Sequence, residues 1–182
     1  YMKCKNIIIT GGNKGIGFGL VKKLSEEHNV LFTVRSQKKG EKTLNAISEK
    51  NIRPKFVIMD IGSNSSVNNG FEAVKKYMDK VDILINNAGI LIPGLKYDIK
   101  AIETNDEDIL KTFNINTVGV LRVVSLVAPL MNKGGIILNI SSGMGQLQDM
   151  GTGSTAYRLS KTALNALTVI LSSELKNRSI SV

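Results

Sequence analysis

Short apolar segments alternate along this chain with longer segments in which apolar residues recur at helical spacing. The short segments contain many β-branched residues and are hydrophobic throughout, which is typical of strands buried on both faces. We expect five such strands, at residues 7–10, 30–35, 55–60, 81–86 and 136–141. Helical spacing predicts helices at 16–28, 38–50, 63–80, 106–131 and 155–177, with Pro93 and Gly94 in a loop and Gly134-Gly135 ending the fourth helix.

Five alternations of strand and helix predict an α/β fold, a doubly wound parallel sheet of the Rossmann type with three layers, α/β/α. The length favours a single domain over residues 1–182. Residues 179–182 look like the start of a sixth strand. We therefore expect the fold to continue into C-terminal strands that are missing from these residues.

The composition excludes several classes of protein. With 42% hydrophobic and 21% charged residues the chain resembles a soluble globular protein, and no run of about 18 apolar residues predicts a membrane span. Cys4 is the only cysteine, so we expect no internal disulfide and a reducing, cytoplasmic location. His28 is the only histidine, which argues against a histidine-based triad or a multi-histidine metal site. We expect no metal.

The net charge of +9 raises the question of nucleic-acid binding. The basic residues are scattered in pairs such as Lys22-Lys23, with no block of five or more and no recognised nucleic-acid motif. We interpret the charge as a solvated basic surface.

The glycine-rich turn after the first predicted strand indicates a phosphate site. Residues 7–17 read IIITGGNKGIG, with glycines at 11, 15 and 17. Such a turn directs backbone N–H groups and the positive end of a helix dipole at one place, which suits a phosphate. The spacing differs from the GxGxxG of long-chain dehydrogenases.

Polar residues follow the other strands at their carboxyl ends, where folds of this class bind ligands. Asn86-Asn87-Ala88-Gly89 follows the fourth strand and Ser141-Ser142 the fifth. Tyr157 and Lys161 are four residues apart at the start of the last helix, so they share one face. A lysine ammonium beside a phenol favours the phenolate, which makes the phenol a usable proton donor and acceptor near neutral pH.

These motifs, with Asn116-x-x-Gly119 between them, occur in an order that closely resembles the short-chain dehydrogenase/reductase family from residue 6 to residue 182. The opening turn and the following LVKKL are most similar to carbonyl-reductase-type members. The resemblance implies hydride transfer between a nicotinamide cofactor and a small carbonyl or alcohol substrate. Aldehydes, ketones and quinones are the expected substrates; the family's substrate lid lies beyond residue 182.

The resemblance implies four catalytic residues. Tyr157 would donate the proton, Lys161 would support it and hydrogen-bond the nicotinamide ribose, Ser142 would polarise the substrate oxygen, and Asn116 would hold a water that links Lys161 to solvent. Ser141 is the alternative to Ser142, because 14 residues separate Ser142 from Tyr157, more than in many family members.

The resemblance also implies a set of cofactor-binding residues spread over the strand ends. Asp60 matches the family's adenine-contacting aspartate; its alternative role is to cap a helix, which Ser63 would do better. For Asn86 we favour a structural tie between strands. The full set is Gly11, Asn13, Lys14, Gly15, Ile16, Gly17, Arg35, Asp60, Ile61, Asn87, Ala88 and Gly89, together with Tyr157 and Lys161.

The end of the second strand favours NADP(H) over NAD. An acidic residue there would accept the ribose hydroxyls of NAD and repel a 2′-phosphate. Residues 33–37 contain no acid, and Arg35 lies among them, while Lys14 precedes Gly15 in the turn. Two other interpretations stay open: an NAD-linked alcohol or steroid dehydrogenase, and a dinucleotide-binding protein without turnover.

The two long helices predict a partner. Helices 106–131 and 155–177 carry apolar residues on more than one face, and such a helix needs a contact besides its own sheet. Since the family often pairs these two helices across a two-fold axis, we expect a homodimer through them.

Overall fold

The computed structural model describes residues 4–47, 52–92 and 99–182. The predicted end of the second helix (48–50) and the loop residues Pro93 and Gly94 lie outside them. Five strands form one fully parallel sheet in the order β3-β2-β1-β4-β5. They are β1 (Asn6–Ile9), β2 (Asn29–Val34), β3 (Lys55–Ile58), β4 (Val81–Asn86) and β5 (Met131–Asn139).

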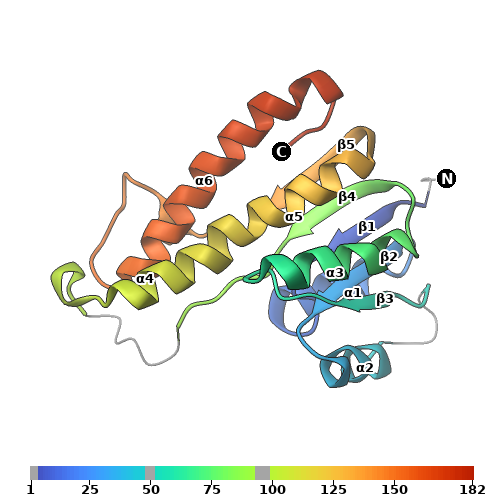
Figure 1. The fold of residues 1–182 in the computed structure, drawn as a ribbon, viewed down its shortest axis with the longest axis horizontal. Coiled ribbons are helices and arrows are strands. Elements are labelled where there is room, and N and C mark those ends of the chain that lie inside the picture. The colour runs from blue at the N-terminus through green and yellow to red at the C-terminus, as the bar shows by residue number, and fades with distance from the viewer. Residues whose placement is uncertain (1–3, 48–51, 93–98) are drawn as a thin grey trace.

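Helices cover both faces of this sheet (Figure 1). One hydrophobic core joins the sheet to α1 and α2, and the other joins it to α3, α5 and α6. The predicted doubly wound, three-layer Rossmann-type fold is therefore confirmed. The helices are α1 (Gly15–Leu24), α2 (Gln37–Asn45), α3 (Asn64–Lys75), α4 (Asp106–Phe113), α5 (Gly119–Val127) and α6 (Thr155–Leu175).

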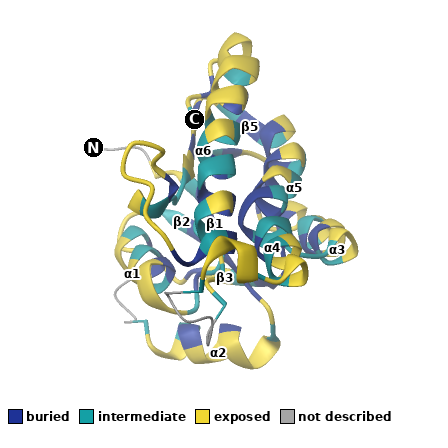
Figure 2. Ribbon diagram, turned by 90° about the vertical axis from the view of Figure 1, so that its left-hand side faces the viewer, coloured by how far each residue is buried: buried dark blue, intermediate teal, exposed yellow. Residues whose placement is uncertain are grey.

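The central strands are buried on both faces, as their unbroken apolar runs predict (Figure 2). In β1, Ile8 faces one core while Ile7 and Ile9 face the other, and all three are at most 1% exposed. Successive side chains of a strand point to opposite faces, so a strand in the middle of this fold needs no polar positions.

Several predicted boundaries are wrong. Helix α2 ends at Asn45 and strand β3 at Ile58, before the predicted residues 50 and 60. Helix α1 ends at Leu24 and not at residue 28, and α3 ends at Lys75 and not at residue 80; tighter turns follow both. The pair Gly134-Gly135 does not end a helix but lies within β5, which begins at Met131. The pairing of β4 with β5 shifts register there, and Gly134 takes φ +76°, a conformation that glycine adopts readily.

The long helix predicted at 106–131 consists of three segments. A π-helical turn, Asn114–Val118, joins α4 to α5, and Gly119 N–H donates to the carbonyl of Asn114 across five residues. Among the described residues, the run Asp106–Leu130 is the one helix with the length and composition to cross a membrane. Its buried residues, such as Val120 and Val124, belong to the core with α3 and α6, so its apolar character is that of a core helix.

The last residues lie along the outer edge of β5. Ser181 pairs with Ile136 in parallel, and Ile137 N–H donates to the carbonyl of Ser181 at 2.8 Å. Residues 179–182 therefore take the place at which a sixth strand was expected.

Candidate active site

The glycine turn (residues 11–17) follows β1 and has a backbone that only glycine fits well. Gly11 and Gly15 have φ of +69° and +54°. A Cβ on Gly17 would lie 2.3 Å from the carbonyl oxygen of Gly11 and 2.5 Å from Nδ2 of Asn87. The three glycines thus allow the turn to close tightly against the end of β4.

Thr10 and Asn87 tie the ends of β1 and β4 together. The backbone N–H groups of Asn87 and Ala88 both donate to Oγ1 of Thr10 at 3.0 Å. The Asn87 amide donates to the carbonyls of Thr10 and Gly11 at 2.9 and 3.1 Å. Asn86 makes the structural tie expected of it, donating to Oδ1 of Asn139 on β5 at 2.9 Å.

The N-terminus of α1 opens at the end of this turn. Lys14 occupies the N-cap position, and no side chain caps the helix. The first N–H groups of an uncapped helix lack intrahelical partners, and with the helix dipole they favour an anion. Asn13 and the exposed Ile16 complete the turn. The turn fits the diphosphate of a dinucleotide.

Two basic side chains lie near this turn. Lys14 and Arg35 are both exposed, and within the described ranges neither takes part in an ion pair. Arg35 directly follows β2 and comes two residues after Thr33, whose Oγ1 accepts from Gly11 N–H at 3.1 Å. Both cations are thus available to an anionic ligand on the turn.

The loop after β3 is held by its own polar groups. Asp60 Oδ1 accepts from Gly62 N–H at 2.9 Å, and Asp60 N–H donates to Ser66 Oγ at 2.9 Å. Ser63, not Asp60, caps α3, since its side chain accepts from Ser66 N–H. Ile61 is buried at 4% exposure.

Asn116 lies inside the π-helical turn and is almost fully buried. Its side chain forms two hydrogen bonds with the backbone of Ile90. Oδ1 accepts from the N–H and Nδ2 donates to the carbonyl, each at 2.8 Å. It also donates to Ser160 Oγ at 3.0 Å. Asn116 therefore joins the segment after β4 to α6.

The side chain of Lys161 extends from α6 toward the same region as Asn116. Its ammonium donates to the carbonyl of Ile140 at 2.7 Å, and the residue is 5% exposed. Burial lowers the pKa of the Lys161 ammonium, because a charge is less stable away from water. A Cβ on Gly89 would lie 3.1 Å from Asn116 Oδ1 and 3.8 Å from Lys161 Nζ, so glycine keeps this space open.

Tyr157 and Ser142 complete the group. Lys161 Nζ lies 5.7 Å from the centre of the Tyr157 ring, one helical turn away as the spacing predicts. Ser142 Oγ accepts from Met144 N–H at 3.2 Å, whereas the buried Oγ of Ser141 has no partner among the described residues. No hydrogen bond joins the hydroxyls of Ser142 and Tyr157 in the part of the chain that the structure describes.

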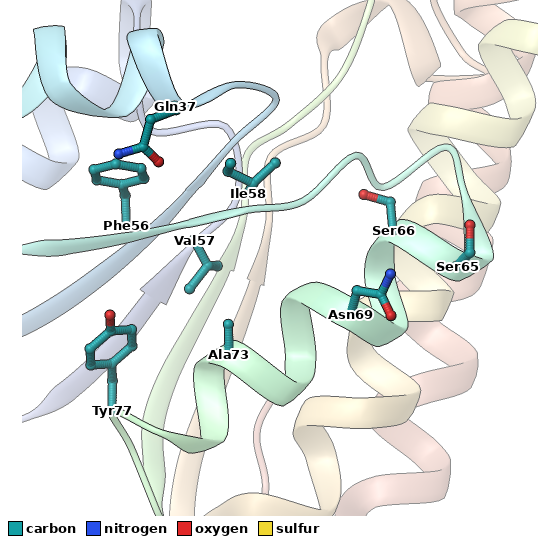
Figure 3. A pocket seen from close by; sticks show the side chains of 9 residues that line it. All are labelled: Gln37, Phe56, Val57, Ile58, Ser65, Ser66, Asn69, Ala73 and Tyr77. Carbon is teal, nitrogen blue, oxygen red and sulfur yellow. The ribbon is translucent and has the colours of Figure 1, made fainter.

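A hollow of about 550 Å³ lies away from this group, between α3, the start of α2 and the edge strand β3 (Figure 3). Phe56 and Tyr77 line it, with Ser66 at one end. It contains none of the predicted catalytic residues, so this hollow is separate from the Asn116–Lys161 group.

The sequence did not predict the residues that support the site through hydrogen bonds to its functional side chains. Thr10, Ser160 and the backbone of Ile90 carry no chemistry of their own. Their signal is only proximity to a motif: Thr10 precedes Gly11, and Ser160 precedes Lys161. Their roles appear when the strand ends meet in space.

Comparison with known proteins agrees with this geometry. Residues 5–182 match the short chain dehydrogenase family. The chain is 31% identical to an uncharacterised oxidoreductase of Methylorubrum extorquens, over 98% of this chain and 70% of that protein. It is 32% identical to a sorbitol-6-phosphate 2-dehydrogenase of Klebsiella pneumoniae, over 100% and 67%.

Its structure resembles that of a blue fluorescent protein from a metagenomic library, solved in complex with NADPH. The TM-score is 0.84 at 28% identity, covering 97% of this chain and 70% of the other. The glycine turn, the Asn116–Lys161 group and these matches agree: the chain belongs to the short-chain dehydrogenase family of oxidoreductases, which use nicotinamide cofactors.

Proposed function

We propose that the protein is an NADPH-dependent reductase of small carbonyl compounds: aldehydes, ketones or quinones. The observation that carries this proposal is Lys161, buried beside the Tyr157 ring and held by the Ile140 carbonyl. Among the described residues no acid forms an ion pair with Lys161. Burying a lysine without an acid is costly, so a purely structural role is a poor explanation for it. A protein that only binds dinucleotide has no need of this pair.

The chemistry follows from what each group can donate. A bound nicotinamide would supply the hydride, and the substrate oxygen would gain negative charge as the carbonyl carbon accepts it. Tyr157 donates the proton to that oxygen, and Ser142 donates a hydrogen bond that stabilises the developing charge. The Lys161 ammonium favours loss of the tyrosine proton. Gly89 leaves space beside Asn116 and Lys161 for a water that returns the proton.

The cofactor rests on the glycine turn in this proposal. The N-terminus of α1 would hold its diphosphate, Asp60 and Ile61 would hold its adenine, and Tyr157 and Lys161 would hold its nicotinamide ribose. Asn87, Ala88 and Gly89 border the same path at the end of β4. The NADPH bound by the structural neighbour supports this assignment by analogy.

Preference for NADPH rests on Arg35 and Lys14. Each charge-assisted hydrogen bond to a phosphate contributes about 1.5–3 kcal/mol, and exposure of both side chains reduces this figure. At about 1.4 kcal/mol per tenfold, the pair favours NADPH over NADH by roughly 10- to 1,000-fold.

Two measurements on the full-length protein test the proposal. Absorbance of NADPH, followed with a panel of aldehydes, ketones and quinones, should fall with at least one substrate. Binding of NADPH without turnover of any of them would favour the non-catalytic alternative.

Titration of both cofactors with the unaltered protein, Arg35→Asp and Arg53→Asp tests the preference. Arg53 is an exposed arginine that precedes β3, at the opposite end of the sheet from Arg35, so it is the matched control. We expect NADPH binding to weaken for Arg35→Asp alone. Equal affinities for NADPH and NADH in the unaltered protein would contradict the assignment.

A homodimer through the two long helical stretches, 106–131 (α4 to α5) and 155–177 (α6), stays a proposal. So does a cytoplasmic location. Val124 and Leu164 are buried in the core, but Leu121 on α5 and Val169 on α6 are 41% and 71% exposed. Exposed apolar residues on both helices support a second copy as the partner. Light scattering at micromolar concentration should give the mass of a dimer; a monomer would contradict it.

A further inference from the structure

Arg122 on α5 connects two segments that lie far apart in the sequence. Its Nη1 donates to the carbonyl of Ile61 at 3.1 Å, and its Nε donates to Oδ1 of Asn64. On the other side, Nη1 and Nη2 donate to the backbone and side-chain oxygens of Asn114, at 3.1 and 2.6 Å. One half-buried guanidinium therefore holds the loop after β3 and the π-helical turn together.

The same two segments also touch directly. Asn114 Nδ2 donates to the carbonyl of Gly62 at 2.9 Å. A Cβ on Gly119 would lie 2.8 Å from the carbonyl oxygen of Ile61, so the helix backbone passes close against the loop. Arg122 thus supports a contact in which the two segments already lie close together.

The Asn114 carbonyl is the group that defines the π-helical turn. It accepts from Gly119 N–H across five residues, and Arg122 donates to the same oxygen. A π turn contains one residue more than an α turn, which changes the direction of the side chains around it by about 100°. Asn116 lies inside this turn, so its hydrogen bonds to Ile90 depend on the π-helical geometry of the turn.

We propose that Arg122 is a positioning residue that links the adenine end of the cofactor site to the catalytic end. It holds the Ile61 loop for the adenine and, through Asn114, the turn that orients Asn116. Its donors are charged and its acceptors are oxygens fixed in backbone or amide groups, which gives strong and directional bonds. The inference rests on the proposed function, since it assigns both ends to one nicotinamide nucleotide.

The main test compares Arg122→Leu with Arg178→Leu in the full-length protein. Arg178 holds the other end of the same helical run, donating to the Ala128 carbonyl at 2.8 Å, so its loss removes a similar tether away from the site. We expect Arg122→Leu to lower kcat by ten- to a hundredfold and to raise the Kd for NADPH severalfold. Arg122→Lys, which keeps the charge without the planar fork, should recover part of both. Arg178→Leu should lower the melting temperature and change neither constant by more than twofold.

Amide hydrogen exchange without cofactor tests the link itself. Exchange should rise in Arg122→Leu at both 60–66 and 112–119, and in Arg178→Leu at neither. Unchanged exchange at 112–119, or a kcat loss that simply follows the melting temperature in both variants, would overturn the inference. Failure of the proposed function would show differently, as no NADPH turnover by the unaltered protein.

Asn64→Ala keeps the test decisive if Arg122→Leu does not fold. Asn64 is exposed, and this variant removes one acceptor of Arg122 without burying an unpaired charge. We expect a two- to fivefold rise in the Kd for NADPH and faster exchange at 60–66. No change in either would overturn the inference.

Discussion

The glycine turn and the loop at 142–154 border the same candidate site but are built in opposite ways. In the turn, a Cβ on Gly17 would collide with backbone, and Thr10 and Asn87 tie it to β4 through four hydrogen bonds. In the loop, residues 146–152 are all exposed, and Leu147 is 76% exposed. Arg158 holds its far end by the carbonyls of Gly153 and Thr152.

This difference matches the two ligands that the site is proposed to hold. A cofactor shared by a whole family is bound by backbone geometry that tolerates no extra atom. A substrate that differs between family members is contacted by an exposed loop, whose side chains the fold does not constrain. Changes in the turn should therefore weaken cofactor binding. Changes in the exposed part of the loop, residues 146–152, should alter the KM for the substrate and leave the Kd for NADPH unchanged.

The largest effect is expected in the turn. Gly17→Ala places a methyl group 2.3 Å from the Gly11 carbonyl and should weaken NADPH binding by about a hundredfold or more, since the backbone has to move. Gly19→Ala is the matched control, because a Cβ at Gly19 meets nothing within 4 Å. Fluorescence titration with NADPH measures both. Similar affinities for the two variants would show that the tight turn is not what binds the cofactor.

A smaller, different effect is expected in the loop. Arg158→Ala frees the carbonyls of Gly153 and Thr152, and should raise the KM for the carbonyl substrate by about three- to tenfold. The Kd for NADPH should stay within twofold of the unaltered value. Steady-state kinetics and titration on the same preparation test this. A larger change in the Kd for NADPH than in KM would break the division between turn and loop.

The smallest effect concerns how the stability of the folded chain depends on pH through Lys161. Burial lowers the pKa of Lys161 in the folded chain, so above that pKa and below about 10.5 the unfolded chain binds more protons. The stability cost of the buried charge is complete below the folded pKa and is relieved as the pH rises through this window. Urea unfolding between pH 7 and 10.5 should show stability rising relative to Lys161→Met. A parallel course for the two proteins would contradict it.

The sequence predicted the sheet and the ordered motifs because both depend on local patterns. Unbroken apolar runs such as Ile7–Ile9 mark buried strands, and the spacing of Tyr157 and Lys161 places them on one helical face. The position of β5 was not predictable in the same way. Gly134 reads as a helix end, and only the pairing of β4 with β5 makes it part of an irregular strand.

The supporting contacts of the site were also beyond sequence reasoning. The π-helical turn around Asn116 leaves no mark in the apolar spacing of residues 106–131, because apolar residues there lie on more than one face, so a shift of the helical phase interrupts no single stripe. Arg122 reads as an ordinary exposed cation. Its partners Ile61 and Asn114 lie 61 and 8 residues away, and only the folded chain brings them to one guanidinium.

The central claim is that Tyr157 transfers the proton in a reductase, and its removal tests this most directly. The measurement is kcat of Tyr157→Phe with saturating NADPH and a carbonyl substrate. Tyr77→Phe is the control, since Tyr77 lies after α3 beside the hollow at β3. General acid catalysis is typically worth about 10²- to 10⁴-fold, so Tyr157→Phe should lose at least a hundredfold in kcat while Tyr77→Phe keeps its activity. A loss below about tenfold in Tyr157→Phe, with NADPH still bound, would contradict the account.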